Sequence, residues 1–311
     1  MEKKYELTDE TIVINVNTTL YRIRALKDFG FVKKGDLGGF IENEENLSQL
    51  DECWIYDDAV VAGKSKVTNN AKVKDKANVF QNVNVRGNAI VSGQAIIRGN
   101  ASISENAHVS ENALVCDNAN IYGDAYVHGG ATVEGSSSVY DFAEVYDNAC
   151  IDDYAKIYER SKVFENADVY GHSFILGNSY IHGECNIRSY AMIMENAEIS
   201  ERALIRGNAR ILGNAFVGGR HTIIDGNAEI NGSGYIISCR DWALVDSFGS
   251  RDRATTFFRC KDGKVRVVCG CFHGTIDEFE KKVRKSHKRN QFAKEYLLVA
   301  KLMKTRFKHV K

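Results

Sequence analysis

The densest group of charged side chains in this sequence is a basic run near its end. Four closely spaced cations, Lys281, Lys282, Arg284 and Lys285, fall within five residues. Lysine and arginine side chains neutralise phosphate groups with little further requirement on their surroundings. We therefore consider these four residues candidate phosphate-binding residues, for nucleic acid or for a nucleotide-like ligand. The alternative, which we favour, is a solvated helix face, or a face that meets an acidic neighbour.

His221 is the histidine with the most unusual position. It stands where a six-residue repeat loses its phase, whereas the histidines of the preceding repeat occupy regular positions. A catalytic base needs a group to act on or an orienting carboxylate, and neither is evident at useful spacing. His221 is therefore a weak candidate, and we predict no catalytic residue.

A metal site is conceivable at Cys269, Cys271 and His273, which alternate and would face one side of a strand. Cys260 would share that facing if Asp262-Gly263 forms a two-residue turn. It would then pair with Val265, about 13 Å along the strand from Cys269. Four zinc ligands must converge within about 2.3 Å of the metal. We therefore predict thiols, no metal site and no cofactor.

An apolar column follows from taking every eighteenth residue. A polar column would be the default for a solvent-facing surface, so an apolar one indicates a partner. We predict self-association as a dimer or trimer through this column, with packing by a terminal cap as the alternative. Its residues are Tyr122, Tyr140, Tyr158, Leu176, Met194 and Leu212, with Phe174 and Met192 beside them.

The element that must position these residues is a strict six-residue repeat. Val or Ile stands at position 61 and at every sixth residue through Val217, 27 times in succession. A small residue precedes each by two positions, and Val83 is the exception. Gly, Asp, Glu or Asn usually follows two positions later, as at Gly87 and Asp117.

A period of six fits neither a helix nor a simple strand. It fits a short strand followed by a corner, with the aliphatic residue pointing inward. Gly, Asn and Asp suit a corner that needs positive φ. Three units then close one coil, and the region holds about nine to ten coils stacked at roughly 4.8 Å.

This spacing resembles the hexapeptide-repeat family, whose members fold as left-handed parallel β-helices. The resemblance, not the period, implies the handedness. Many members are acyltransferases that carry a catalytic His on a loop and build their site between the subunits of a trimer. Here no loop interrupts the regular coils, so we lean against an enzyme and keep this transferase class as the alternative.

Residues 1–50 lie outside the repeat and are predicted to form an N-terminal β cap. They contain Tyr21-Arg22-Ile23-Arg24-Ala25, Gly35-Asp36-Leu37-Gly38-Gly39-Phe40 and Asn46-Leu47-Ser48. These blocks resemble the front end of phage- or prophage-associated proteins and of YdcK-like proteins described as transferases. The body is predicted to run over 51–249, with one extra residue near His221 and a second slip before Ala243 and Val245.

Residues 250–311 are predicted to form a small α+β module with a hairpin and two helices. The hairpin turns at Asp262-Gly263, and Thr275 with Glu278 forms a capping box that opens the first helix. Ile276, Phe279 and Val283 share one face of that helix. The second helix runs to the end of the chain, and its predicted apolar stripe comprises Phe292, Tyr296, Val299, Met303 and Phe307.

Charge is balanced overall, with 41 basic and 41 acidic residues, but it is unevenly spread. From Ser250 onward there are 18 Lys and Arg against 6 Asp and Glu, so the tail is basic and the body acidic. Cysteines in ordinary repeat positions, such as Cys53 and Cys185, indicate a reducing compartment, and no long apolar run occurs. We predict a cytoplasmic protein with no membrane contact.

The leading functional hypothesis is a structural or interaction scaffold that self-associates and derives from a phage or other mobile element. The competing hypotheses are an acyltransferase of the hexapeptide-repeat type and a module that binds nucleic acid or a nucleotide-like ligand.

Overall fold

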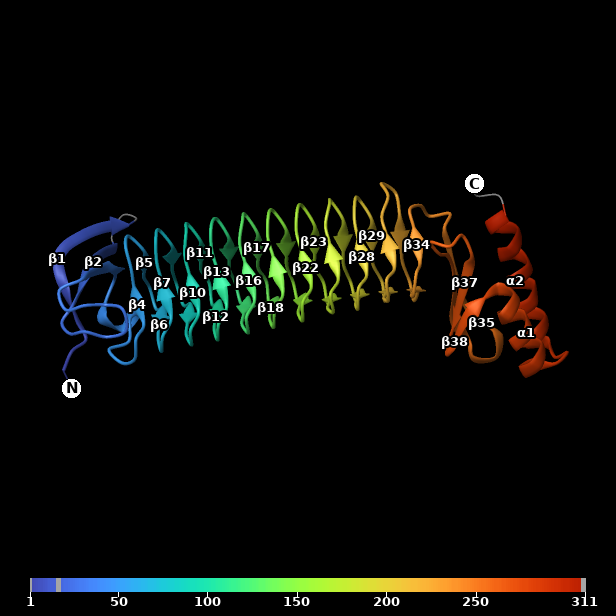
Figure 1. The fold of residues 1–311 in the computed structure, drawn as a ribbon, viewed down its shortest axis with the longest axis horizontal. Coiled ribbons are helices and arrows are strands. Elements are labelled where there is room, and N and C mark those ends of the chain that lie inside the picture. The colour runs from blue at the N-terminus through green and yellow to red at the C-terminus, as the bar shows by residue number, and fades with distance from the viewer. Residues whose placement is uncertain (1, 15–17, 309–311) are drawn as a thin grey trace. The chain divides into compact units, whose positions relative to one another are not determined.

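The structure is a computed structural model that describes residues 2–14 and 18–308. It is a left-handed parallel β-helix with an N-terminal β cap and a small α+β module at its C-terminal end (Figure 1). The chain divides into two compact units, Met1–Glu165 and Asn166–Lys311.

The first unit begins with the cap. Strands β1 (Tyr5–Ile14), β2 (Thr18–Ala25) and β3 (Leu37–Ile41) are antiparallel in succession, and the short helix η1 (Glu44–Asn46) follows. Strand β3 then pairs in parallel with the coil strand β5. The cap thus supplies the first coil with a hydrogen-bonded neighbour, which removes an exposed sheet edge.

The coils of the first unit are built from two-residue strands in three parallel sheets. Each strand pairs with the strand three places further along the chain, as when Ile121 lies opposite Val139. The inward aliphatic residue of each strand is fully buried from Val61 onward, which confirms the predicted core. The strands are β4 (Trp54–Ile55), β5 (Val60–Val61), β6 (Lys66–Val67), β7 (Lys72–Val73), β8 (Asn78–Val79), β9 (Asn84–Val85), β10 (Ile90–Val91), β11 (Ile96–Ile97), β12 (Ser102–Ile103), β13 (His108–Val109), β14 (Leu114–Val115), β15 (Asn120–Ile121), β16 (Tyr126–Val127), β17 (Thr132–Val133), β18 (Ser138–Val139), β19 (Glu144–Val145), β20 (Cys150–Ile151), β21 (Lys156–Ile157) and β22 (Lys162–Val163).

The corners adopt the predicted left-handed conformation, and the structure adds a hydrogen bond between corners of neighbouring coils that the sequence analysis did not predict. Acidic residues as well as glycines occupy them, with φ of 61° at Glu105 and 60° at Asp75. Their carboxylates accept a hydrogen bond from the corner amide of the next coil, Gly123 N at 3.1 Å and Gly93 N at 2.8 Å. A charge-assisted bond of this kind offsets the cost of a side chain at positive φ.

The second unit continues the same coil construction. Its strands are β23 (Asp168–Val169), β24 (Phe174–Ile175), β25 (Tyr180–Ile181), β26 (Asn186–Ile187), β27 (Met192–Ile193), β28 (Glu198–Ile199), β29 (Leu204–Ile205), β30 (Arg210–Ile211), β31 (Phe216–Val217), β32 (Ile223–Ile224), β33 (Glu229–Ile230) and β34 (Tyr235–Ile236). Ile205 pairs with Ile224, so the extra residue near His221 is confirmed. Counting one strand of a sheet per coil, the two units contain about eleven coils, slightly more than expected.

The C-terminal module is a four-stranded antiparallel sheet with two helices. Its elements are β35 (Trp242–Phe248), η2 (Gly249–Arg251), β36 (Arg253–Arg259), β37 (Val265–Cys269), β38 (Phe272–Thr275), α1 (Ile276–His287) and α2 (Gln291–Lys308). The second phase slip was wrongly interpreted as a coil, because Ala243 and Val245 lie in β35 and pair with Phe257 and Thr255 of β36.

A hydrophobic core joins the helices to the sheet. The capping box of Thr275 and Glu278 is present, and Ile276, Phe279 and Val283 are buried, as predicted. The stripe of α2 is rotated from the prediction, since Ala293 and Ala300 are buried in place of Phe292 and Val299. The small side chains of Ala293 and Ala300 let α2 pack closely in the core of the module, and the larger Phe292 and Val299 lie at the edge of that core. The last three residues of the predicted helix lie outside the described part of the chain.

Among the described residues, no helix has the length and apolar character that a bilayer-spanning segment requires.

Candidate functional site

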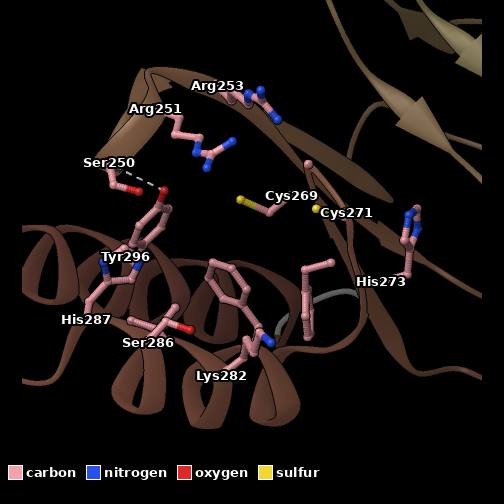
Figure 2. A pocket seen from close by; sticks show the side chains of 14 residues that line it. Ser250, Arg251, Arg253, Cys269, Cys271, His273, Lys282, Ser286, His287 and Tyr296 are labelled. Atoms are coloured by element: carbon pink, nitrogen blue, oxygen red, sulfur yellow. Dashed lines mark hydrogen bonds between the residues drawn. The ribbon is translucent and has the colours of Figure 1, made fainter.

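A cavity lies in the C-terminal module, between the sheet and the helices. It has a volume of about 750 Å³. Figure 2 shows the guanidinium of Arg251, the thiol of Cys269 and the ring of Tyr296 around one space, with α1 along one side. Its lining comes from η2, the start of β36, the end of β37, the turn into β38 and the two helices. The lining residues are Ser250, Arg251, Arg253, Cys269, Gly270, Cys271, Phe272, His273, Phe279, Lys282, Val283, Ser286, His287 and Tyr296.

The η2 turn forms one wall and is held against α2. The amide of Ser250 donates to the Tyr296 hydroxyl at 3.2 Å, and the amide of Gly249 donates to Glu295 Oε2 at 3.1 Å. Gly249 has φ of 75°, and a Cβ there would lie 2.2 Å from Tyr296 Cζ. Only glycine lets the backbone at position 249 pack directly against the Tyr296 ring, so Gly249 determines the position of this wall.

The turn between β37 and β38 forms the opposite wall. Cys269 pairs with Phe272, which leaves Gly270 and Cys271 as a two-residue turn. The prediction that Cys269, Cys271 and His273 alternate along one strand is therefore wrong. A second hairpin interrupts the strand, and Gly270 with φ of 59° provides the reversal.

The other hairpin also differs in register from the prediction. Val265 pairs with Arg259 instead of Cys260, and the Cys260 amide bonds to Lys264 O. The loop therefore contains three residues ending at Gly263, whose φ is 76°. A three-residue loop with glycine in the left-handed position is the usual alternative to a two-residue turn, and it shifts the pairing by one residue.

The thiol of Cys269 is held inside the cavity wall. The Thr255 hydroxyl donates to its sulfur at 3.1 Å. Burial raises the pKa of the Cys269 thiol, against the opposing effects of the Thr255 hydrogen bond and the Arg253 charge. The thiol is therefore protonated at neutral pH, and a protonated thiol is a poor nucleophile.

Aromatic rings form the floor of the cavity. The Phe272 and Phe279 ring centroids are 5.4 Å apart, and the Phe279 and Tyr296 rings meet edge to face at 5.8 Å. The His287 ring lies 5.4 Å from Tyr296. These contacts hold the floor rigid and present an apolar surface next to polar walls.

The charges around the cavity are of one sign. Arg251, Arg253 and Lys282 are exposed and line it, and none of the lining residues, all of them described, is acidic. None of these three cations forms a salt bridge within the described chain. An unneutralised group of cations at a partly apolar cavity is an arrangement that favours an anion.

The four predicted phosphate-binding residues do not converge on one point. All are exposed on α1, but only Lys282 lines the cavity. Arg284 lines a separate depression between α1 and α2. The pKa of Asp277 is lowered chiefly by its hydrogen bond to Lys304, with a smaller contribution from the charge of Lys281. The sequence analysis did not identify Arg251 and Arg253. The signal that could have found them is the pair of arginines that flank Asp252, shortly after Gly249.

His221 is exposed at the corner where the repeat slips, and it lies outside the cavity. Its carbonyl accepts a hydrogen bond from the Cys239 thiol at 2.9 Å. Within the described residues, its ring has no hydrogen bond or ion pair. The structure therefore brings no orienting carboxylate to it.

The predicted apolar column consists of stacked rings in the first unit. Tyr122 and Tyr140 have centroids 4.7 Å apart and Tyr140 and Tyr158 4.9 Å apart, each pair nearly parallel at 3°. All three are half-buried. In the second unit the predicted residues are also half-buried on the coil surface: Phe174, Leu176, Met192, Met194 and Leu212.

A second aromatic column occurs on another face of the first unit. His128 and Tyr146 stack at 5.1 Å, and Tyr146 and Phe164 at 4.9 Å. Stacked rings therefore occur on two faces of these coils.

Another group of potential ligand atoms, from Cys116, Asp117 and Glu134, lies within 4.8 Å on the coil surface. Burial raises the pKa of the Cys116 thiol.

Comparison with known proteins adds one partial relationship. No protein-family model matches this chain. Over 80 residues it is 34% identical to a protein of Escherichia coli (strain K12) named "Uncharacterized acetyltransferase YdcK". The similarity spans 21% of this chain and 24% of that protein. Together with the coil architecture, it shows a hexapeptide-repeat β-helix that is similar to YdcK over part of its length.

Proposed function

We propose that this protein is a self-associating scaffold and that copies of it meet through the tyrosine column of Tyr122, Tyr140 and Tyr158. The observation that supports this proposal is the parallel stacking of the three half-buried rings at 4.7 and 4.9 Å. Tyrosine is enriched at protein interfaces because a rigid ring combines apolar area with a polar tip.

Pairing of identical columns across a two-fold axis satisfies both partners with one surface. The rings already lie in fixed rows, so little side-chain entropy is lost when a second row covers them. In the second unit, Leu176, Met194 and Leu212 occupy the equivalent repeat positions, with Phe174 and Met192 beside them. We assign them the same role, in a dimer or a trimer.

Sedimentation velocity of the full chain tests this proposal. Tyr140→Glu with Tyr158→Glu places two carboxylates in the column while leaving the inward residues unchanged. The expected result is conversion of an oligomer to a monomer with an unchanged circular dichroism spectrum. Lys64→Glu with Lys66→Glu adds the same number of carboxylates at exposed positions elsewhere and should remain oligomeric. A wild type that is monomeric at tens of micromolar contradicts the proposal.

A second candidate function, acyl transfer, is supported by the similarity to the protein named as an acetyltransferase. In this proposal His221 is the candidate base and the site is completed by another subunit. Calorimetry with acetyl-CoA tests it, with His221→Ala against His108→Ala, a histidine in a regular coil position. No binding of acetyl-CoA to the wild type, at protein concentrations where it is oligomeric, removes this candidate.

We further infer a reducing compartment, the cytoplasm, and an origin in a phage or other mobile element. The first inference is supported by buried thiols at Cys53 and Cys260 and exposed ones at Cys239 and Cys271. Mass spectrometry of alkylated protein from cells tests it, since an exposed thiol that is already oxidised would contradict it. The second inference depends on the resemblance of the N-terminal blocks.

A further inference from the structure

We propose that the cavity of the C-terminal module is a binding site for a small phosphate monoester that carries a flat aromatic group, of nucleotide size. This site is separate from the tyrosine column, and the proposal does not depend on self-association.

The phosphate end is formed by Arg251 and Arg253, whereas Lys282 lies on the opposite, α1 side of the cavity (Figure 2). Arg251 ends η2, Arg253 begins β36 and Lys282 projects from α1. Asp252 between the arginines has φ of 46°, which reverses the chain so that both arginines border the same cavity. A guanidinium binds two phosphate oxygens at once.

The electrostatics favour an anion of high charge density. The three cations have no acidic neighbour in the cavity lining. The two arginines carry like charges on one side of the cavity, and an anion held between them lessens their repulsion. A phosphate monoester with nearly two negative charges at pH 7 matches two guanidinium groups better than a single carboxylate does.

The apolar end is the floor of Phe272, Phe279 and Tyr296. Their rings hold one another in edge-to-face and tilted contacts, so the floor is formed before a ligand arrives. A flat ring of the ligand would contact this floor while its phosphate reaches the arginines. The volume of about 750 Å³ falls within the range of about 300–1,000 Å³ that is usual for small-ligand sites.

Two polar groups of the cavity wall, the Cys269 thiol and the Tyr296 hydroxyl, are already engaged in hydrogen bonds. The Cys269 thiol is protonated, because burial raises its pKa, and it accepts a hydrogen bond from Thr255. The Tyr296 hydroxyl already accepts the amide of Ser250. The proposal therefore assigns these two groups no covalent role and concerns binding alone.

Isothermal titration of the full chain with adenosine 5′-monophosphate, inorganic phosphate and adenosine tests this proposal. We expect the monophosphate to bind at least tenfold more tightly than either fragment. Its affinity should fall at least tenfold in the Arg251→Gln, Arg253→Gln variant. Both arginines are exposed and form no salt bridge among the described residues, so this variant should fold, which its melting temperature checks.

The matched control is Arg284→Gln with Lys285→Gln, which removes two cations of α1 that do not line the cavity. It should bind the monophosphate as the wild type does. No saturable binding at millimolar concentration overturns the proposal, and so does binding that survives loss of both arginines. Equal affinity for inorganic phosphate and adenosine 5′-monophosphate refutes the proposal that the aromatic rings contact a flat group of the ligand. Binding of a labelled oligonucleotide that only the α1 control weakens, without monophosphate binding, indicates the alternative nucleic-acid surface.

Discussion

The ammonium nitrogen of Lys4 lies 3.3 Å from the sulfur of Cys53, inside the N-terminal cap. It also donates to the carbonyl oxygens of Cys53 at 3.0 Å and Leu50 at 3.1 Å, and only 1% of the residue is exposed. Burial lowers the pKa of Lys4. The ammonium thus satisfies carbonyl groups where the chain enters its first coil, at the cost of burying a charge.

Lys4→Met should therefore destabilise the cap. Methionine fills similar space but leaves the Cys53 carbonyl without its donor and the Leu50 carbonyl with only the Cys53 thiol at 3.7 Å. An unsatisfied buried acceptor costs about 1–3 kcal/mol. Urea unfolding measures the change. Lys3→Met is the control, because Lys3 is exposed and pairs only with Glu44 at 2.8 Å. Equal midpoints for the two variants would show that the buried donor contributes nothing.

The tyrosine column predicts an alkaline loss of stability. Burial, and then the neighbouring Tyr122 and Tyr158, raise the pKa of Tyr140 to about 12 from its ordinary value of 10.0. A folded pKa above the unfolded value contributes stability that is complete below pH 10 and is lost as pH rises through about 12. This loss of stability is measured from urea unfolding midpoints between pH 10 and about pH 12, and absorbance at 295 nm follows tyrosine ionisation over the same range.

Tyr140→Phe should remove this part of the pH dependence, because phenylalanine keeps the ring stack and lacks the ionisable hydroxyl. Tyr180→Phe is the control, since Tyr180 is 45% exposed on the coil surface. Its replacement should leave the alkaline slope unchanged. The assignment fails if the Tyr140 variant retains the full slope.

Ile157→Asp in the middle of the repeat should abolish soluble folded protein. Ile157 is fully buried and pairs with Val139 on the adjacent coil, so an aspartate would be a buried charge without a partner. Lys156→Asp makes the same substitution one residue earlier on the same strand, at an exposed position. It should fold. Expression yield and circular dichroism of the two variants decide the matter.

Gly249→Ala should destabilise the C-terminal module by about 1–3 kcal/mol more than Gly263→Ala. Both glycines have nearly the same positive φ, 75° and 76°, so the backbone strain of an alanine is shared. Only at Gly249 would the new methyl meet the Tyr296 ring, while nothing lies within 4 Å at Gly263. Thermal unfolding separates them, and equal losses would mean that the ring moves aside freely.

The coil was predictable because its signals are local and repeated. The aliphatic residue from Val61 to Val217 and the corner residue two positions later each carry the same physical requirement in every unit. The β35 strand was missed because Ala243 and Val245 imitate one more repeat by alternation alone. Alternation reports which side a residue faces and cannot distinguish a parallel coil from an antiparallel sheet.

The cavity was predictable only in part, because its residues come from distant elements. Lys282 was found as one member of a basic run, while Arg251 and Arg253 join it only through the packing of η2 against Tyr296. The register of the hairpin depended on a loop of two or three residues. Asp262-Gly263 suits both, and one residue of difference moves Cys260 out of the predicted pairing.

Equivalent residues on neighbouring coils of the first unit are always 18 residues apart, so the length of this unit can change only in steps of one coil. Asn82 bonds to Asn100, and Asn100 to Asn118, always across 18 residues. An in-frame duplication or deletion of 18 codons within these coils replaces every lost partner with an equivalent one. It changes the distance along the coil axis between two sites that flank the change by about 4.8 Å. Evolution can therefore change the distance between two surface sites in this unit by whole coils. A single added residue does not complete a coil, so it is accommodated as a bulge, as near His221.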